Sequence, residues 1–322
     1  MPCFEALCQV LVRYPIGVHA LEKGATPAEL SALSASAPHV PTSELCEFLA
    51  SWNGGMLFHE TIRLRAARNI EATQTGALWF GELLDGSVWL DAHGRVLQID
   101  PVTCDPLVAG NRFGTWLETT LCREAMLFDP DGDFSDVFDN DGELVARVRK
   151  KRALAGRKRD LDASLYPFEL AKLSLSQGDA GMAQQWLWES VSKDPLAGSA
   201  WELLASLQKQ SGDSRAAFES LLHAAEAALS KTLRANRLVD AADLVPSQAA
   251  TLFAAAGAAD PSLGGRLLAL LRQAIAENDL SEARHQLARI EYLSDRLTPA
   301  QTTEISLLAK KLKARDALRV VQ

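Results

Sequence analysis

The residues best able to do acid–base or metal chemistry in this chain are six histidines: His19, His39, His59, His93, His223 and His285. None stands at metal-ligand spacing from another histidine, a cysteine or a suitable acid. A hydrolase could in principle gather His59-Glu60 with Asp85 and the turn at 91–93, but we favour polar loop residues beside turns. The sequence has no nucleophile elbow, Walker loop or dinucleotide-binding fingerprint. We therefore expect no enzyme activity, no catalytic residue, no metal and no cofactor.

The chain has five cysteines: Cys3, Cys8, Cys46, Cys104 and Cys122. They are odd in number and form no C-x-x-C pair, so we expect buried free thiols in a reducing compartment. The apolar stretch 4–12 contains Glu5 and has no Lys or Arg before it, unlike a secretory signal. We expect a helix that faces the core with Phe4, Leu7, Val10 and Leu11. These features predict a cytoplasmic protein.

Length and charge limit the class of protein further. The chain has 322 residues, which as a soft prior corresponds to about two domains. Its net charge of −8 gives no general attraction to nucleic acid or to an anionic membrane. No apolar run approaches the roughly 18–20 residues that span a bilayer. We expect neither nucleic acid nor membrane as a partner, and no small-molecule ligand.

An acidic run precedes residue 145: Asp129, Asp131, Asp133, Asp136, Asp139, Asp141 and Glu143. Its start is similar to a calcium-binding EF-hand loop, but the spacing is wrong. An EF-hand loop needs glycine at its sixth position and glutamate at its twelfth. Counted from Asp129, Gly132 is the fourth residue and the twelfth is Asn140. We favour Asp-Gly turns that join extended segments at 126–128, 134–138 and 144–145.

A basic run follows at once: Arg147, Arg149, Lys150, Lys151, Arg152, Arg157, Lys158 and Arg159. No aromatic residues interleave, and the preceding acids would oppose a phosphate backbone. We favour a solvated connecting helix that could also pair with the acidic run. Because the composition changes here, we predict one domain at residues 1–146, a basic linker or connecting helix at 147–160 and a second domain at 161–322.

The second half repeats itself with a period of 34 residues. Leu170-Ala171 recurs as Leu204-Ala205, Gly178-Asp179 as Gly212-Asp213, and Ala183 as Ala217. This is the period of tetratricopeptide (TPR) repeats, which are pairs of antiparallel helices. The alanines would let paired helices approach closely, and the glycines would end first helices. We place a further unit around Asn278-Asp279, a degenerate unit broken at Pro246, and a closing helix at 299–321.

TPR-like repeats leave a concave groove, lined in that family by the first helix of each unit. Carried onto this register, the resemblance implies partner-binding positions at Phe168, Lys172, Glu202, Ser206 and Lys209. Ordinary solvated helix positions are the alternative. The sequence lacks the Lys/Asn ladder of TPR clamps that grip chaperone tails.

The first half has its own order of elements. A predicted helix at 44–52 stops at Asn53-Gly54-Gly55, where we expect Gly54 or Gly55 to end it with a positive φ. Strand-like runs at 78–84 and 87–90 are joined by Asp85-Gly86, and a turn at 91–94 leads into a strand at 95–100. We expect another helix at 28–36, a capped helix entrance at Thr42-Ser43, and a helix start at 112–117.

This order, over roughly residues 27–141, resembles the SUKH superfamily, whose members include bacterial toxin-immunity proteins and a fungal regulator of cell-wall synthesis. The resemblance implies an α+β domain with a mixed or antiparallel sheet flanked by helices. The chain departs from it at Asp85-Gly86, where members often show Gly-Asp. The predicted architecture is therefore an α+β N-terminal domain followed by an all-α TPR-like helical repeat domain.

The predicted function follows from both resemblances. We expect a non-enzymatic protein-binding protein of the immunity type, which would sequester a toxin or effector. The alternative is a TPR scaffold or adaptor in a signalling or assembly complex. In either case the partner is a protein.

Overall fold

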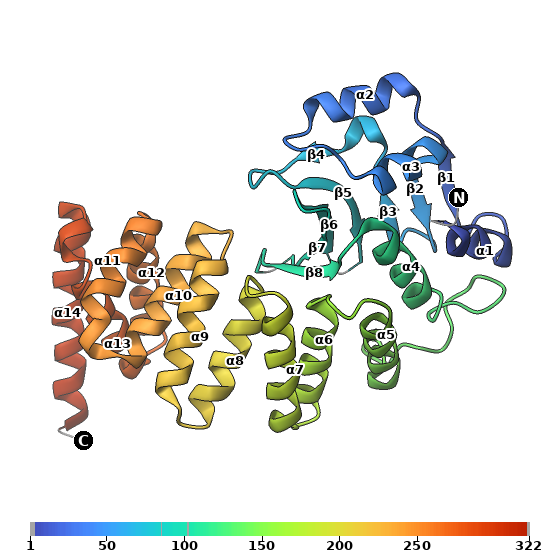
Figure 1. The fold of residues 1–322 in the computed structure, drawn as a ribbon. Helices are drawn as coiled ribbons and strands as arrows, with labels where there is room; N and C mark the ends of the chain where they lie inside the picture. Colours follow the sequence, from blue (N-terminus) through green and yellow to red (C-terminus); the bar gives the residue numbers. More distant parts are fainter. Residues whose placement is uncertain (1–3, 85, 102, 321–322) are drawn as a thin grey trace. The chain divides into compact units, whose positions relative to one another are not determined.

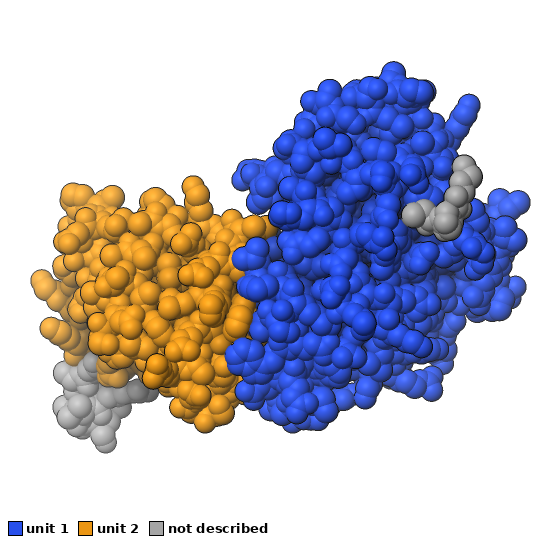
Figure 2. Space-filling model, viewed as in Figure 1, with its two compact units in different colours: residues 1–200 blue, residues 201–322 orange. Residues whose placement is uncertain are grey.

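A computed structural model describes residues 4–84, 86–101 and 103–320 of the chain (Figure 1). It divides into two compact units, Met1–Ala200 and Trp201–Gln322 (Figure 2). An antiparallel sheet with its helices comes first, and a helical repeat region follows, which confirms the predicted order of the two architectures. The predicted domain limits at residues 146 and 161 remain a prediction.

The described residues of the first unit form one eight-stranded sheet. Its strands are β1 (Ala20–Lys23), β2 (Trp52–Leu57), β3 (Ile62–Leu64), β4 (Glu71–Ala72), β5 (Leu78–Leu83), β6 (Gly86–Leu90), β7 (Val96–Ile99) and β8 (Pro106–Gly110). They are hydrogen-bonded in the order β1-β2-β3-β5-β6-β7-β8, with β4 beside β5, and every pair is antiparallel. The strands predicted at 78–84, 87–90 and 95–100 are thus confirmed, except that Asp85 lies outside the described residues.

Four helices accompany the sheet: α1 (Glu5–Arg13), α2 (Pro27–Ser36), α3 (Ser43–Ser51) and α4 (Phe113–Glu124), with a 3-10 turn at η1 (Ala67–Asn69). Thr26 and Glu29 form a capping box at α2. Thr42 caps α3, as predicted. Phe48 of α3 and Phe80 of β5 each contact the ring of Phe113 in α4. These buried aromatic rings fix α3 and α4 on the sheet.

The predicted role of the glycines after α3 is wrong. The helix ends at Ser51, and Trp52 is already extended as the first residue of β2, so the glycines lie inside a strand. Both do have positive φ, 85° at Gly54 and 127° at Gly55. A Cβ would lie 2.6 Å from Ala66 N at Gly54 and 2.3 Å from Ala20 O at Gly55. Close approach of neighbouring backbone, and not helix termination, requires glycine here.

Two predictions about side-chain burial need correction. Leu7 of α1 is buried, but Phe4, Val10 and Leu11 are only half-buried. The thiols are free, yet Cys8 and Cys104 are exposed, and Cys46 and Cys122 are half-buried. Cys3 lies outside the described residues.

The repeat region is helical from α5 onward. Its helices are α5 (Ala146–Arg159), α6 (Leu165–Ser176), α7 (Ala180–Lys193), α8 (Gly198–Gln210), α9 (Ser214–Ala227), α10 (Lys231–Leu244), α11 (Ala249–Ala259), α12 (Leu263–Ala276), α13 (Leu280–Glu291) and α14 (Pro299–Val320), with short turns η2 (Pro246–Gln248) and η3 (Ser294–Arg296). The predicted connecting helix, break at Pro246 and closing helix are all present as α5, η2 and α14.

Each of three hairpin turns contains a glycine or asparagine followed by an aspartate. Gly178, Gly212 and Asn278 have φ of 78°, 86° and 62°, which is the left-handed conformation that ends a helix. The aspartate that follows each one caps the next helix, because its carboxylate accepts the backbone N–H three residues on. Ala171, Ala183, Ala205 and Ala217 are buried, as close helix packing requires. The predicted helical hairpins are confirmed at these turns.

Strand β8 joins the sheet of the first unit to its first helical hairpin. Tyr166 Oη on α6 donates a hydrogen bond of 2.8 Å to Ala109 O, and Ser164 Oγ accepts one of 3.0 Å from Val108 N. Ser190 Oγ on α7 donates to Ser164 O at 2.8 Å. All three bonds are buried, where loss of either partner is costly. The last strand and the first hairpin are therefore parts of one packed structure.

Candidate partner-binding site

The described residues of the histidine-centred catalytic candidate are engaged in separate contacts. His59 Nε2 lies 3.1 Å from Gly132 O, and Glu60 pairs with Arg63 at 2.7 Å. Asp91 Oδ1 accepts the backbone N–H groups of His93 and Arg95, both at 2.9 Å. Asp91 and Glu60 are thus engaged within or next to their own turns, His59 contacts a distant loop, and Asp85 lies outside the described residues. Across the described ranges, no group of three or more His, Cys, Asp or Glu could hold a metal ion.

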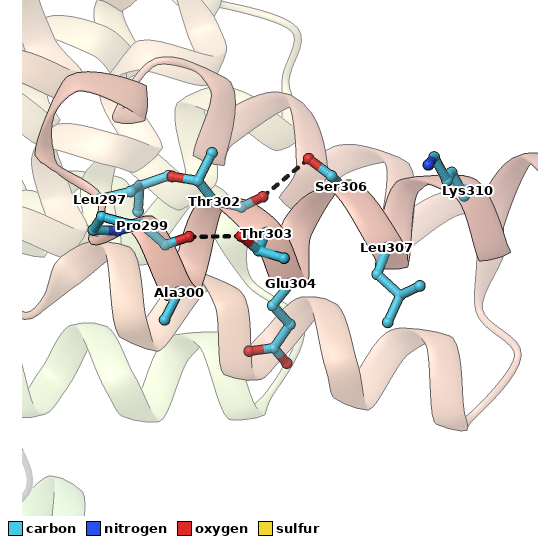
Figure 3. Close-up of a pocket in the computed structure, with 9 residues that line it drawn as sticks. All are labelled: Leu297, Pro299, Ala300, Thr302, Thr303, Glu304, Ser306, Leu307 and Lys310. Atoms are coloured by element: carbon cyan, nitrogen blue, oxygen red, sulfur yellow. Dashed lines mark hydrogen bonds between the residues drawn. The ribbon is translucent and has the colours of Figure 1, made fainter.

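A wide hollow of about 980 Å³ runs along α14 and is lined only by residues between Leu297 and Lys310 (Figure 3). The hydroxyls of Thr303 and Ser306 donate to Pro299 O and Thr302 O of the same helix, at 2.9 and 3.0 Å. Glu304 is paired with Arg272 at 2.5 and 2.6 Å. These polar groups of the hollow are occupied by α14 itself or by Arg272 of α12, and they do not converge. This hollow is the outer side of a closing helix, and we assign no site to it.

The five predicted groove residues fall on two helices in different units. In the first unit, Phe168 is buried on α6, and Lys172 Nζ lies exposed 5.6 Å from the centre of its ring. In the second unit, Ser206 and Lys209 are exposed on α8. A shared groove lined by all five stays a prediction.

Glu202, the remaining predicted residue, has a structural contact. Its Oε2 accepts hydrogen bonds from Arg237 Nε and Nη2, at 2.8 and 2.7 Å. The Arg237 side chain is only 1% exposed, and its Nη1 donates to Ala224 O at 2.8 Å. Glu202 therefore compensates a buried charge that links α8 to α10.

Lys172 lies at the edge of a pocket of about 420 Å³ formed by α4, α5, α6 and the segment before α5. Four cations line this basic pocket: Arg123, Arg149, Arg152 and Lys172. Leu144 and Leu173 supply apolar wall, and Glu169 and Ser176 complete the lining. Arg149 and Arg152 share a face of α5 because they are three residues apart.

Two of the four cations are held in place by carboxylates. Arg123 Nη2 bonds both oxygens of Glu169, at 2.6 and 2.9 Å, and its side chain is 8% exposed. Arg152, 13% exposed, pairs with Glu124 of α4. Arg149 and Lys172 are exposed, and neither forms an ion pair with any described residue. The basic pocket thus has two fixed, neutralised pairs and two charges left for a ligand.

The acidic run does not neutralise the basic residues of α5. The sequence suggested ion pairs between α5 and the acidic run, but no such pair forms among the described residues. Asp129 and Asp139 accept backbone N–H groups of their own turns instead. Arg157 pairs with Glu189 of α7 at 2.8 and 3.1 Å. Burial raises the pKa of Glu189, but its bonds from Arg157 and Lys193 prevail and hold that pKa below its usual value.

The sequence does not reveal the basic pocket, because its run of basic residues at 147–159 predicts a solvated connecting helix. The pocket needs Arg123 of α4 and Lys172 of α6 beside α5, and residues so far apart in sequence give no local signal. The spacing of Arg149 and Arg152 was the one available sign.

Comparisons with known proteins add little to this geometry. No family model matches the chain, and no curated protein matches it. Among solved structures, Pseudomonas aeruginosa PilF is similar with 15% identity over 53% of this chain and 78% of its own, at a TM-score of 0.36. MamA is similar with 16% identity over 48% of this chain and 87% of its own, at a TM-score of 0.32. The fold therefore rests on the structure of the chain itself.

No helix among the described residues combines the length and apolar character needed to cross a bilayer. The basic pocket can bind an anionic group by electrostatic attraction. Fixed guanidinium groups and two free cations stand beside two leucines, an arrangement that can hold an anionic group and pack an aliphatic one.

Proposed function

We propose that this chain is a non-enzymatic protein-binding scaffold that holds its partner on the helices of its repeat region. The observation that carries this proposal is the basic pocket, where Arg149 and Lys172 are exposed and unpaired within the described structure beside Leu144 and Leu173. A pocket lined by both charged and apolar side chains is suited to binding the surface of another protein. The hairpin repeats support the proposal, because such helices present extended binding surfaces.

A narrower form of this function comes from the SUKH resemblance. In that form, the sheet domain would sequester a toxin or effector, and the repeats would extend the interface. The antiparallel sheet with flanking helices supports this reading only at the level of architecture, which many functions share. The scaffold is our main proposal.

Crosslinking in the native cell tests the scaffold. A photo-reactive amino acid placed at exposed α6 or α8 positions such as Ser176 or Ser206 should capture one stoichiometric partner, identified by mass spectrometry. Lys172→Glu and Lys209→Glu, made separately, should each weaken that capture if their helix carries the interface. Capture solely from photo-reactive groups on the sheet would favour the sequestering form, and no stoichiometric partner from any position would reject both.

A further inference from the structure

We propose that the basic pocket binds an internal acidic segment of the partner protein. In this complex, Asp or Glu side chains pair with Arg149 and Lys172, and a neighbouring aliphatic side chain packs against Leu144 and Leu173. This inference rests on the proposed scaffold function and names the chemistry of its partner.

The net charge of the pocket predicts that its ligand is negatively charged. Arg123 is neutralised by Glu169, and Arg152 by Glu124. Two positive charges remain, on Arg149 and Lys172, in a chain whose net charge is −8. A ligand with one or two carboxylates restores the local balance, whereas a basic or neutral segment would leave both charges uncompensated.

The fixed pairs also lower the cost of binding. Arg123 is clamped by both Glu169 oxygens, and its guanidinium carbon lies 4.9 Å from the centre of the Tyr166 ring. Tyr166 is itself buried and bonded to Ala109 O. The floor of the pocket is therefore ordered before the ligand arrives, and only the two exposed side chains need to be immobilised.

The size and lining favour a peptide over a simple anion. About 420 Å³ lies within the range of sites that enclose an organic ligand. A phosphate ion would leave the leucine wall unused, but an aliphatic side chain next to a carboxylate would cover it.

Nucleic acid fits this surface less well than an acidic peptide. The residues that line the pocket include no aromatic side chain on which a base could stack. The segment that leads to Leu144 carries exposed acids at Asp131, Asp133, Asp136, Asp141 and Glu143. A long polyanion would meet this repulsion, whereas a short acidic segment can end before it.

Fluorescence anisotropy with defined peptides tests the inference on the full chain. The probe is a fluorescein-labelled pentapeptide, Glu-Glu-Leu-Glu-Glu, with its C-terminus amidated so that no free α-carboxylate contributes. We expect saturable binding that weakens as salt rises, and loss of binding when every Glu is replaced by Gln. Replacing the central Leu with Ser should weaken binding about threefold or more, because the leucine wall loses its partner.

Variants of the chain locate the binding. Arg149→Glu with Lys172→Glu should weaken the peptide at least about tenfold, which corresponds to about 1.4 kcal/mol. Both side chains are exposed, so the fold should survive, and circular dichroism checks this. The matched control is Lys150→Glu with Lys158→Glu, which makes the same change of charge at exposed positions of α5 outside the pocket and should alter affinity less than about twofold.

Four outcomes would overturn the inference. One is no peptide binding at low salt, and a second is an equal loss in the control variant, which would indicate diffuse attraction to α5. A third is displacement of the peptide by an equal concentration of inorganic phosphate, and a fourth is tighter, pocket-dependent binding of a 20-nucleotide single strand. If the native partner is still captured by the pocket variant, only this inference fails. If no partner is captured at all, the scaffold proposal fails.

Discussion

His19 is a single side chain whose chemistry depends on where the sheet places it. Its Nδ1 accepts a hydrogen bond of 3.1 Å from Phe58 N, and its ring packs edge-on against Tyr14 and Phe58. Burial, with a smaller contribution from the nearby charge of His59, lowers the pKa of His19 to about 4. Protonation would add a proton to Nδ1, the nitrogen that accepts the bond from Phe58 N, and would place a positive charge in a partly buried site, so the fold favours the neutral form.

Stability should therefore fall as acid is added. Below pH about 6.5 the unfolded chain takes up this proton while the folded chain does not, so the loss runs from pH 6.5 down to about 4 and then stops. Because His19 is only half-buried, we expect about 1–2 kcal/mol. His19→Asn, which keeps an acceptor for Phe58 N, should remove that part of the pH dependence in urea unfolding.

His93→Asn is the matched control, because His93 is exposed in the turn at 91–94. Its unfolding free energy should follow the parent's pH profile. Identical profiles for the parent and His19→Asn would contradict the assignment.

Glu202 gives a second test at one position. Glu202→Gln would leave the Arg237 guanidinium buried without its carboxylate. Because Glu202 is itself 44% exposed, we expect a loss of about 2 kcal/mol, below the 3–5 kcal/mol of a fully buried pair. Chemical denaturation measures it. Glu219→Gln, which breaks the surface pair with Arg215, should cost less than about 0.5 kcal/mol. Equal losses would show that Arg237 does not depend on Glu202.

Helix α5 packs closely against α6 at Gly156. A Cβ at Gly156 would lie 2.5 Å from Cδ1 and Cε1 of Tyr166, whose ring is buried and cannot move aside. Gly156→Ala should therefore destabilise the first unit by about 1–2 kcal/mol, although alanine favours helix formation by up to about 1 kcal/mol. The measurement is the thermal unfolding midpoint.

Gly181→Ala is the control within a neighbouring helix. The nearest atom to its added Cβ is 3.8 Å away, so only the gain in helix propensity applies. The midpoint should stay or rise. A higher midpoint for Gly156→Ala as well would mean that α5 and α6 separate readily, and it would weaken the case for an ordered basic pocket.

Local signals explain which elements were predictable. The Gly-Asp pairs at 178–179 and 212–213 specify both the end of one helix and the cap of the next, so the hairpins can be predicted from the sequence. At the third turn, Asn278 adopts the left-handed conformation in place of glycine. Gly54 and Gly55 also signalled positive φ, but the reason lies in neighbouring strands that only the fold supplies. The basic pocket was not predictable because Arg123, Arg149 and Lys172 meet only through packing. The 34-residue register places Glu202 on α8, but its buried partner Arg237 on α10 gives no signal in the local sequence.

Across the whole chain, the first compact unit combines the sheet with the first helical hairpin, and the second is helical. Inside the first unit, β8 is buried along its length and bonded to Ser164 and Tyr166. Burial also raises the pKa of Tyr166, so its hydroxyl stays a hydrogen-bond donor throughout the physiological range. Sheet and hairpin should therefore open together and not as separate modules.

Tyr166→Phe tests this coupling. The substitution leaves Ala109 O buried without its donor and should cost about 1–3 kcal/mol. Hydrogen exchange followed by mass spectrometry should speed up in β8, in α6 and in α5, which packs on the Tyr166 ring through Gly156. Exchange in α10 to α13 of the second unit should not change. Tyr292→Phe, at a ring that stacks on Phe253 in the second unit, should leave β8 and α6 untouched. Faster exchange confined to α6 would mean that the hairpin opens without the sheet, and the first unit would then be two modules in contact.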